Sequence, residues 1–542
     1  MNPLHTDRDS LIEYSPRDRA RALLDPGSAR ELLGPFDRLT SPWLPIQGIV
    51  TQSDDGVVLM KGLLNHQSVI LITIDGDFQG GSLGEVGGAK IAGALELATQ
   101  DNQRGIATAA IMLLESGGVR LQEANLGLAA IGDIHSAIVG LRRYQPVIGV
   151  ITGPVGCYGG MSIAAGLCSY LVMTREARLG LNGPAVIEQE AGIDELDASN
   201  KPLIWSLTGG RQRVDAGLAD ILTLDDVTTI RHHLTELLAR GVPARHRSDD
   251  TASALQRLQA LPPSGPESPS GNLATNRAKA WLTALASPKQ ATVASCLSVQ
   301  YADIQINQHD CRLIAVVPNA KSRFPRARNG EVGLEEGWAL AQLIHDTIQA
   351  DRHCAKKRSL IPLIDVPSQA YGRLEEATGL HQALAGAVSA YAQARLAGHR
   401  IIGLIVGNAI SGAYLAHGYQ AHRLIALDEP GVQFHAMGKA SAARITQRTV
   451  EALDQLADQI PPMGYDLKHY AQLGLLWSTL AVDNANAPSN EDLARVRTAL
   501  TDALTAPLLK GDDHLERPGS TLRQATNHVN AHLQRQWASS QQ

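Results

Sequence analysis

Two glycine-rich turns in the chain could present backbone N–H groups to a negatively charged oxygen. The first reads Gly153-Pro-Val-Gly-Cys-Tyr-Gly-Gly-Met161, and the second reads Gly407-Asn-Ala-Ile-Ser-Gly-Ala413. Each follows a short apolar run and precedes a stretch of small residues, as at a tight turn from strand to helix. Because the first N–H groups of a helix have no internal partner, such a turn can stabilise an anion or an enolate oxygen. The glycines could also serve only for close packing, but duplication of the whole turn favours function.

The segments around the two turns repeat one order of elements. The spacing from Gly153 to Ala177 equals that from Gly407 to Gly431, and small-residue helices follow both turns. An amphipathic helix is expected over 124–141, with His135 on its apolar stripe as a core residue. Strand, turn, helix and strand in this order predict an α/β fold of ββα spiral units covered by helices. The expected strands lie at 147–152, 169–173, 400–406 and 423–427.

Length and composition limit the kind of protein. The 542 residues predict at least two domains, and a Pro-, Ser- and Gly-rich stretch suggests a linker at 263–272, although an ordinary surface loop has the same composition. We therefore place domains at 1–262 and 273–542. A net charge of −6 argues against a generic nucleic-acid binder. The chain shows no signal peptide, no apolar run long enough for a membrane span and no Cys-x-x-Cys pair, so a reduced, cytoplasmic protein is expected.

Several motifs resemble those of the carboxyltransferases. The first half contains Phe78-Gln-Gly-Gly-Ser-Leu-Gly-Glu-Val-Gly-Gly-Ala-Lys90 and Glu115-Ser-Gly-Gly-Val-Arg-Leu-Gln-Glu123. With the first turn, these resemble the β half of biotin-dependent carboxylases and, still more, the β subunit of biotin-independent malonate decarboxylase. The second half contains Ile364-Asp-Val-Pro-Ser-Gln-Ala-Tyr-Gly-Arg-Leu-Glu-Glu-Ala-Thr-Gly379, which resembles the carboxyltransferase α pattern, and its segments 407–418 and 434–439 resemble the malonate decarboxylase γ subunit. The resemblance implies two crotonase-like domains, corresponding to carboxyltransferase β and α halves, fused in one chain.

Departures from the family pattern separate its members. The four-cysteine zinc ribbon usual in bacterial carboxyltransferase β chains is missing, as is an Ala-Met-Lys-Met biotinylation motif. Ser368 and Gln369 stand where the family usually has Gly-Ala after Asp365-x-Pro367. These departures argue against a role for biotin or a metal ion.

The resemblance implies decarboxylation of a malonyl thioester, carried on an acyl carrier protein, to the acetyl thioester and carbon dioxide. An enolate held in backbone oxyanion holes would be the intermediate. No tightly bound cofactor is implied, because the carrier supplies a phosphoribosyl-dephospho-coenzyme A arm; the carrier protein and an acyl-carrier transferase subunit are the implied partners. The implied catalytic residues are Gly117, Gly118, Gly159, Gly160, Ser411, Gly412 and Ala413. The implied substrate-binding residues are Gly80, Gly81, Ser82, Tyr158, Asn408 and His435.

Charged residues receive supporting roles in this interpretation. A tight arginine clamp on the departing carboxylate would stabilise the ground state, so Arg120 and Arg373 are expected to order their loops through carbonyl groups. Buried in an apolar turn, the Cys157 thiol is expected to be inert. The helix-end or solvent-facing charges are expected to be Glu115, Glu123, Glu375 and Glu376, and Lys439 and Arg448 could be solvated as well. Candidate proton donors are Tyr158, Ser411, Tyr414 and His435. Expected docking or phosphate contacts for an acidic carrier are Lys321, Arg323, Arg326 and Arg328, with a solvated run as an equal alternative for Lys356, Lys357 and Arg358.

Three other functions compete with this one. A biotin-dependent acyl-CoA carboxyltransferase would run nearly the same oxyanion chemistry in reverse, and a requirement for biotin would separate the two. A crotonase-type hydratase is disfavoured because no convincing pair of glutamates is placed for water addition. A noncatalytic scaffold is disfavoured by the two intact glycine turns.

Overall fold

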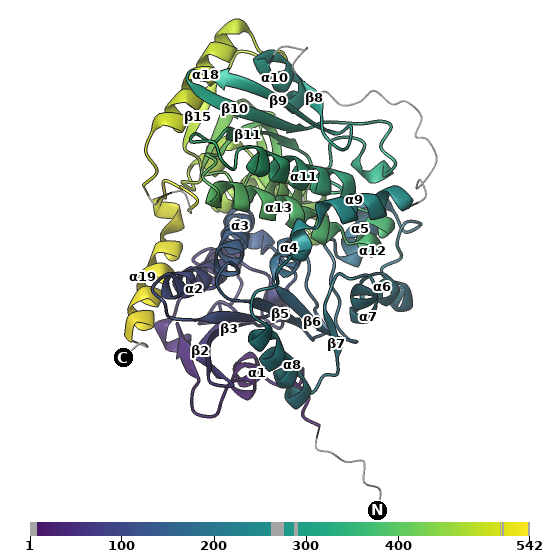
Figure 1. Cartoon of the computed structure of the whole chain (residues 1–542), viewed down its shortest axis with the longest axis vertical. Helices are drawn as coiled ribbons and strands as arrows, with labels where there is room; N and C mark the ends of the chain where they lie inside the picture. Colours follow the sequence, from purple (N-terminus) through teal and green to yellow (C-terminus); the bar gives the residue numbers. More distant parts are fainter. Residues whose placement is uncertain (1–7, 262–275, 287–290, 510, 512–513, 540–542) are drawn as a thin grey trace, which may run out of the picture.

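The computed structural model describes residues 8–261, 276–286, 291–509, 511 and 514–539, and it shows two stacked α/β halves (Figure 1). The linker predicted at 263–272 lies outside the described residues. We call residues 8–261 the first half and residues 276–539 the second half. The expected α/β class with two crotonase-like units is confirmed.

The first half is built on a sheet whose strands lie side by side in chain order. Strands β1 to β3 pair antiparallel, and β3 to β7 pair parallel. The parallel strands β4 and β5 are buried along their whole length, which explains their continuous apolar runs. The strands are β1 (Arg30–Leu32), β2 (Val57–Leu64), β3 (Gln67–Ile74), β4 (Ala109–Leu113), β5 (Val147–Ile151), β6 (Tyr170–Thr174) and β7 (Ile221–Thr223).

The second half repeats this plan. Strands β8 to β10 pair antiparallel, β10 to β13 pair parallel, and β15 continues the sheet beyond β13, while β14 pairs with the end of β12. The duplication predicted from the two turns is therefore present in the sheets. The strands are β8 (Thr292–Val293), β9 (Val299–Ile306), β10 (His309–Val316), β11 (Ser359–Val366), β12 (Ile402–Ile410), β13 (Arg423–Asp428), β14 (Gln433–His435) and β15 (Ser478–Ala481).

Helices fill the space between the two sheets and cover their outer faces (Figure 1). In the first half they are α1 (Pro16–Leu23), α2 (Glu85–Gln103), α3 (Ala124–Leu141), α4 (Gly160–Leu167), α5 (Pro184–Ala191), α6 (Lys201–Thr208), α7 (Gly210–Asp215), α8 (Val227–Arg240) and α9 (Thr251–Ala260). In the second half they are α10 (Arg277–Ala286), α11 (Leu334–Ala350), α12 (Arg373–Thr378), α13 (Leu380–Leu396), α14 (Ser411–Ala416), α15 (Lys439–Ile445), α16 (Val450–Ala457), α17 (Leu467–Ala471), α18 (Asn490–Thr505) and α19 (Gln524–Ser539).

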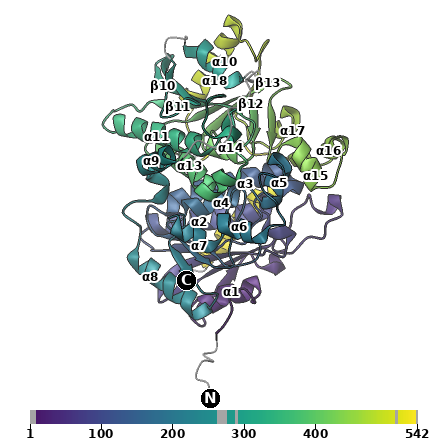
Figure 2. The same ribbon diagram turned by 90° about the vertical axis from the view of Figure 1, so that its right-hand side faces the viewer.

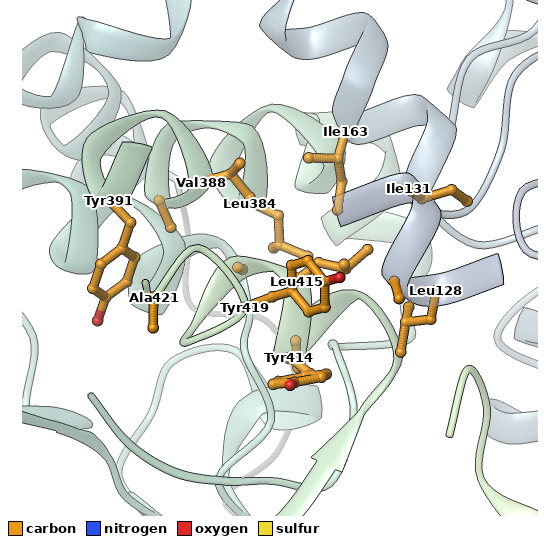
Figure 3. Packing of buried hydrophobic residues seen from close by; sticks show 14 of the residues in the cluster. Leu128, Ile131, Ile163, Leu384, Val388, Tyr391, Tyr414, Leu415, Tyr419 and Ala421 are labelled. Atoms are coloured by element: carbon orange, nitrogen blue, oxygen red, sulfur yellow. The ribbon is translucent and has the colours of Figure 1, made fainter. Parts of the chain in front are cut away.

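The two halves share one hydrophobic core. Buried residues of α3 and α4 meet buried residues of α13 and α14, and Figure 3 shows several of them. Two glycines let the helices approach closely: an added Cβ would lie 2.2 Å from the Tyr419 ring at Gly132 and 2.9 Å from Ala385 at Gly166. The labelled interface residues are Leu128, Ile131, Ile163, Leu384, Val388, Leu415 and Tyr419.

The C-terminal helix of each predicted domain packs on the other half. Helix α9 packs on α11, and C-terminal helix α19 runs along the molecule to pack on α2 (Figure 1). Val529, Leu533 and Trp537 form the buried face of α19, and the Trp537 indole N–H donates to Asp101 Oδ2 at 3.0 Å. The two halves are thus bound together by their terminal helices as well as by their shared core.

Helix α3 is the core helix that was expected over 124–141. The segment Leu121–Leu141 is long and apolar enough to cross a membrane by length and composition alone, contrary to the expectation that the chain has no such run. However, 83% of its most apolar window is buried inside the protein, as in a central helix of a folded core. Its His135 is fully buried, as predicted.

Candidate active site

The loop 115–120 after β4 and the first glycine turn after β5 lie against each other. An added Cβ at Gly118 would be 3.0 Å from the Gly159 Cα and 3.1 Å from the Tyr158 carbonyl oxygen. The N–H groups of Ser116 and Tyr158 link the loops by donating to the Gly156 and Ser116 carbonyls, both at 2.8 Å. The two segments singled out in the first half therefore form one backbone structure.

Most of the predicted N–H donors are already used within this structure. Gly117 N–H donates to the Gly80 carbonyl and Gly159 N–H donates to the Leu181 carbonyl, both at 2.9 Å. Gly118 N–H donates to Ser116 Oγ at 3.1 Å. The resemblance implies one donor from each loop, either Gly117 or Gly118 and either Gly159 or Gly160. The first of these is wrong and the second leaves only Gly160, because pairing of the loops engages the other three N–H groups.

Two neighbouring N–H groups remain open. Within the described residues, neither Val119 N–H nor Gly160 N–H donates a hydrogen bond. Val119 pairs with Leu83 through the Gly118 carbonyl and the Arg120 N–H, so the N–H of Val119 itself points away from Leu83. Gly160 is the first residue of α4. An added Cβ at Gly159 would lie 3.9 Å from the Val119 nitrogen. Gly160 thus stays a candidate oxyanion donor, and Val119 is a candidate that the sequence analysis missed.

A cavity of about 460 Å³ is lined by Val119, while Gly160 is buried behind the lining. Its walls come from both halves, because α15 and the turn before α16 reach the junction next to α5 (Figure 2). Arg448 is the charged residue in the lining, and its guanidinium makes no ion pair within the described part of the chain. The lining includes Gln79, Gly80, Ser82, Gly117, Val119, Gln122, Thr446, Gln447 and Arg448.

A larger cavity of about 610 Å³ lies elsewhere, between α3 and α13, and contains no predicted site residue. We therefore place the site in the 460 Å³ cavity, which Gly80, Ser82, Gly117 and Val119 line. The described part of the chain holds no group of three or more His, Cys, Asp or Glu side chains that could bind a metal ion.

Arg120 holds the loop 115–120 in place through its side-chain hydrogen bonds. Its guanidinium donates to the Asp55 carboxylate at 2.7 Å, to Glu123 at 3.0 Å and to the Ser82 carbonyl at 3.1 Å, with all three charged side chains buried. The predicted loop-ordering role of Arg120 is confirmed. Arg373, by contrast, is exposed, and its backbone N–H rather than its side chain contacts Glu195.

All four glutamates are buried, so the prediction of solvent-facing charges is wrong. The helix-end prediction is confirmed for Glu123, which precedes α3, and for Glu375 and Glu376 in the first turn of α12. Glu115 accepts hydrogen bonds from the backbone N–H groups of Thr152, Gly153 and Gly156. Glu123 and Glu376 likewise accept from backbone N–H groups, at Glu85 and at Leu181 and Asn182. Burial raises the pKa of Glu115 and of Glu376, and it raises the pKa of Glu375 to about 7. These carboxylates are structural acceptors that hold the loops in place.

His135 contacts the open turn directly. Its Nε2 lies 2.8 Å from the Gly160 carbonyl oxygen, so the ring is the Nε2–H tautomer and donates there. Burial lowers the pKa of His135 to about 4, and the ring is neutral near pH 7. A core histidine, as predicted, therefore also fixes the residue that carries one open donor.

The second glycine turn has the same backbone shape as the first, but a side chain of the protein accepts a hydrogen bond from its N–H group. We call such a turn closed. Ser411 has a positive φ of 57°, and Gly412 N–H donates to the Gln369 Oε1 at 3.1 Å. Gly412 is therefore not the free donor that was predicted. Gln369 is one of the residues that depart from the family pattern, so the sequence carried a signal for this difference.

The other predicted residues of the second half lie outside the cavity lining. The Asn408 N–H and side-chain amide donate to Asp365 Oδ1, which fixes the end of β12. His435 is buried, stacks on Tyr465 at 3.9 Å, and bonds to the Met437 backbone through Nδ1; burial lowers its pKa to about 3. The structure thus brings Gly80, Ser82 and Gly117 to the cavity lining. The predicted residues outside the lining are Gly81, Gly118, Tyr158, Gly159, Gly160, Asn408, Ser411, Gly412, Ala413 and His435.

Three of the four proposed proton donors are enclosed. Tyr158 packs its ring near Gly156 and Gly180, and burial raises its pKa. Tyr414 lies in the core with its hydroxyl 3.3 Å from the Tyr470 hydroxyl. His435 is buried as well, so Ser411 alone of the four is not buried. The Cys157 thiol is buried, and burial raises its pKa, in keeping with the expected inert thiol.

The two basic clusters are largely tied into the fold. Arg323 donates to the carbonyls of Leu258 and Leu261, and Arg328 donates to the Ser322 carbonyl. Arg358 binds Asp351 and Asp303, and Lys357 donates to the carbonyls of Asp351 and Arg352. Lys321 and Lys356 remain exposed, so few of these charges are available to a carrier.

Comparisons with known proteins agree with the division of the chain into two halves. Residues 14–259 match the carboxyl transferase domain family, and residues 327–537 match the malonate decarboxylase gamma subunit family. The chain is 37% identical over 241 residues to the malonyl-S-ACP:biotin-protein carboxyltransferase MADC of Malonomonas rubra, which covers 43% of this chain and 76% of that protein. The chain belongs to the malonate decarboxylase branch of the carboxyltransferase family. The two separate matches show that it joins a β-type and a γ-type subunit in one polypeptide.

Two further relatives of this malonate decarboxylase branch are similar over part of the chain. The M. rubra protein of the same description, MADD, is 36% identical over 174 residues, which are 31% of this chain and 60% of that protein. A chain in the crystal structure of a Pseudomonas malonate decarboxylase hetero-tetramer in complex with malonate is 61% identical; the match covers 48% of this chain and 94% of that chain, with a TM-score of 0.47.

His135→Gln should make the protein less sensitive to acid. The folded-state pKa of His135 is about 4, below the usual 6.5, so the unfolded state binds the extra proton between these values. Wild-type stability should therefore fall as pH drops through this window, and the variant should lack that component. Melting temperatures measured from about pH 7 to about pH 4.5 should fall less in the variant than in the wild type.

The control is His232→Gln on α8, where the side chain is 66% exposed. Its melting curve should follow that of the wild type at every pH. Equal acid sensitivity of His135→Gln and wild type would show that His135 does not resist protonation in the folded state.

Proposed function

We propose that this chain decarboxylates a malonyl thioester carried on an acyl carrier protein, giving the acetyl thioester and carbon dioxide. The observation that carries the proposal is the open pair of N–H donors, Val119 and Gly160, of which Val119 lines a cavity with walls from both halves. Membership of the malonate decarboxylase branch supports the choice of substrate.

The reaction needs a place for the electrons that the departing carbon dioxide leaves behind. When the bond between the carboxylate and Cα breaks, its electron pair moves to the thioester oxygen as an enolate. Two preorganised N–H groups aimed at that oxygen lower the barrier by about 3 kcal/mol each, by analogy with other oxyanion holes. Carbon then takes a proton to give the acetyl group. The chain's own contribution is to fix the thioester oxygen on Val119 and Gly160.

Arg448 is suited to bind an anionic group of the substrate that lies outside the reacting centre. It lines the same cavity from the second half, and its guanidinium has no carboxylate partner in the described structure. A guanidinium on the departing carboxylate would oppose the reaction, whereas the same charge on a phosphate of the carrier arm binds ground state and transition state alike. We assign Arg448 to the phosphate of the phosphoribosyl-dephospho-coenzyme A arm.

The partners follow from the same substrate. An acyl carrier protein must deliver the arm, and an acyl-carrier transferase subunit must load it. The names of the M. rubra relatives include a malonyl-S-ACP substrate, and the Pseudomonas structure is a hetero-tetramer, which supports a multi-subunit assembly here.

A second candidate is carboxyl transfer from the malonyl thioester to a biotin protein, which the M. rubra relatives' names describe for those proteins. The first step would be the same, but the carboxyl group would pass to biotin. Gln369 in place of the family's usual small residue, and the closed second turn, favour release of carbon dioxide.

The deciding experiment measures carbon dioxide release from malonyl-carrier protein by the purified chain, with and without avidin. We expect acetyl thioester and carbon dioxide in equal amounts, and no effect of avidin or of added biotin protein. Loss of turnover with avidin, or a strict need for a biotin protein, would establish the carboxyltransferase instead.

Arg448→Gln should raise the KM for a malonyl thioester that carries the phosphate-bearing arm. It should change the KM for a short malonyl thioester without phosphate much less, since a charge outside the reacting centre acts on binding alone. Arg444→Gln on the neighbouring α15, where the side chain is 57% exposed and pairs with Glu190, is the matched control. An equal rise in KM for both substrates would show that Arg448 does not bind the phosphate of the arm.

Gly117→Ala should lower turnover roughly ten- to hundredfold, as expected for a small misplacement of an aligned site. The added Cβ would lie 3.1 Å from the Gly80 carbonyl and would press on the loop beside Val119. Gly160 is a poorer target, because its Cβ would meet the core side chain of Ile131 at 2.7 Å.

The control is Gly183→Ala, where the nearest atom is 3.9 Å away and the backbone is extended. Both variants should melt near the wild-type temperature. Normal turnover in Gly117→Ala would remove the loop 115–120 from the site.

A further inference from the structure

The two glycine turns and the loops that face them correspond at two positions. Leu83 pairs with Val119 in the first half, and Val332 pairs with Gln369 in the second, each as an isolated parallel bridge with the same two hydrogen bonds. Gln369 is therefore the counterpart of Val119. Gly159 and Ser411 share a φ of 57°, which makes Gly160 the counterpart of Gly412.

The two turns differ in one contact. Gly160 N–H is open, while Gly412 N–H is bonded to the Gln369 side-chain oxygen at 3.1 Å. At the position of Gln369 the first half has Val119, whose side chain cannot accept a hydrogen bond. The second turn is thus filled by the chain itself.

The orientation of the Gln369 amide is fixed by its neighbours. Asn182 Nδ2 donates to the Ala370 carbonyl at 2.9 Å and to Glu376 Oε1 at 3.0 Å, and both partners only accept. Asn182 Oδ1 must therefore face Gln369, whose Nε2 donates to it at 2.8 Å. Gln369 Oε1 is left to face the Gly412 N–H, which is a donor.

This network reaches the open turn in two steps. Asn182 follows Leu181, and the Leu181 carbonyl accepts the Gly159 N–H at 2.9 Å. Glu376 also holds both residues by accepting their backbone N–H groups at 2.9 and 2.7 Å. Residues 181 and 182 of the first half are therefore fixed by side chains of the second half, and Gly159 is fixed by them.

We propose that Gln369 is a positioning residue for the first turn: anchored on Gly412, it holds Asn182 and, through Leu181, sets the Gly159 peptide that precedes the Gly160 donor. It acts through these residues and does not touch the substrate. The inference rests on the proposed function, because the Gly160 N–H is taken to bind the thioester oxygen.

The test compares Gln369→Met with Gln382→Met. Methionine keeps the volume of each side chain and removes its hydrogen bonds. Gln382 is also buried and also crosses between the halves, donating to the Gly166 carbonyl at 3.2 Å, but its bond does not reach the open turn. We expect Gln369→Met to lower kcat roughly ten- to hundredfold with a nearly unchanged KM, and Gln382→Met to leave both close to wild type.

Gln369→Glu separates the two bonds of the amide. A carboxylate can still accept from Gly412 but cannot donate to Asn182, so kcat should fall as in Gln369→Met. Hydrogen exchange of a peptide covering 156–163 should rise in both Gln369 variants and stay unchanged in Gln382→Met. Equal kcat values for Gln369→Met and Gln382→Met, or a fall in melting temperature without a change in kcat, would overturn the proposal.

The exchange measurement also separates this proposal from the proposed function. If the wild-type chain releases no carbon dioxide from any malonyl thioester, the function is wrong, while faster exchange at 156–163 would still show that Gln369 positions the turn. If the wild type is active and exchange at 156–163 is unchanged in Gln369→Met, the positioning role is wrong and the function stands.

Discussion

The close packing of the two halves is the constraint on which the site depends. Gly132 and Gly166 bring α3 and α4 against Tyr419 and α13, so the facing glycine turns share one buried core. Across this interface, Glu376 and Gln369 of the second half hold Leu181 and Asn182 of the first. The cavity lined by Val119 therefore has its complete walls only when the two halves are packed together.

Holding backbone loops in a fixed shape requires buried charges, and the protein supplies each with partners. Arg120 is neutralised by Asp55 and Glu123, and Glu115 and Glu376 accept bonds from backbone N–H groups of the loops. A buried charge is costly unless it is paired and hydrogen-bonded, so these groups cannot shift without leaving a partner unsatisfied. Rigidity of this kind suits a site whose donors must already point at the developing enolate oxygen.

The sequence was sufficient to predict the duplicated plan, the core helix with His135 and the two loops of the first half, because hydrophobic periodicity and glycine spacing are local signals. It was not sufficient for the donors themselves. Whether the N–H of Gly117 or of Val119 is open depends on which strand-like partner each loop finds, such as Gly80 or Leu83. The glutamates were misjudged for a similar reason: their burial comes from contacts between segments distant in sequence, such as Glu376 with Asn182.

Duplication of a turn does not duplicate its chemistry, and the difference lies in whether the protein supplies an acceptor for the N–H group. A buried N–H without a partner costs about 1–3 kcal/mol, so the Gly412 N–H, which faces the core, requires an acceptor from the protein and receives Gln369. The Gly160 N–H has no acceptor within the described residues and lies next to Val119, which lines the cavity, so a substrate oxygen can be its acceptor. The same backbone shape therefore has two uses. The closed turn fixes Gln369 at the interface, and the open turn keeps the Gly160 N–H free to donate to the reacting oxygen.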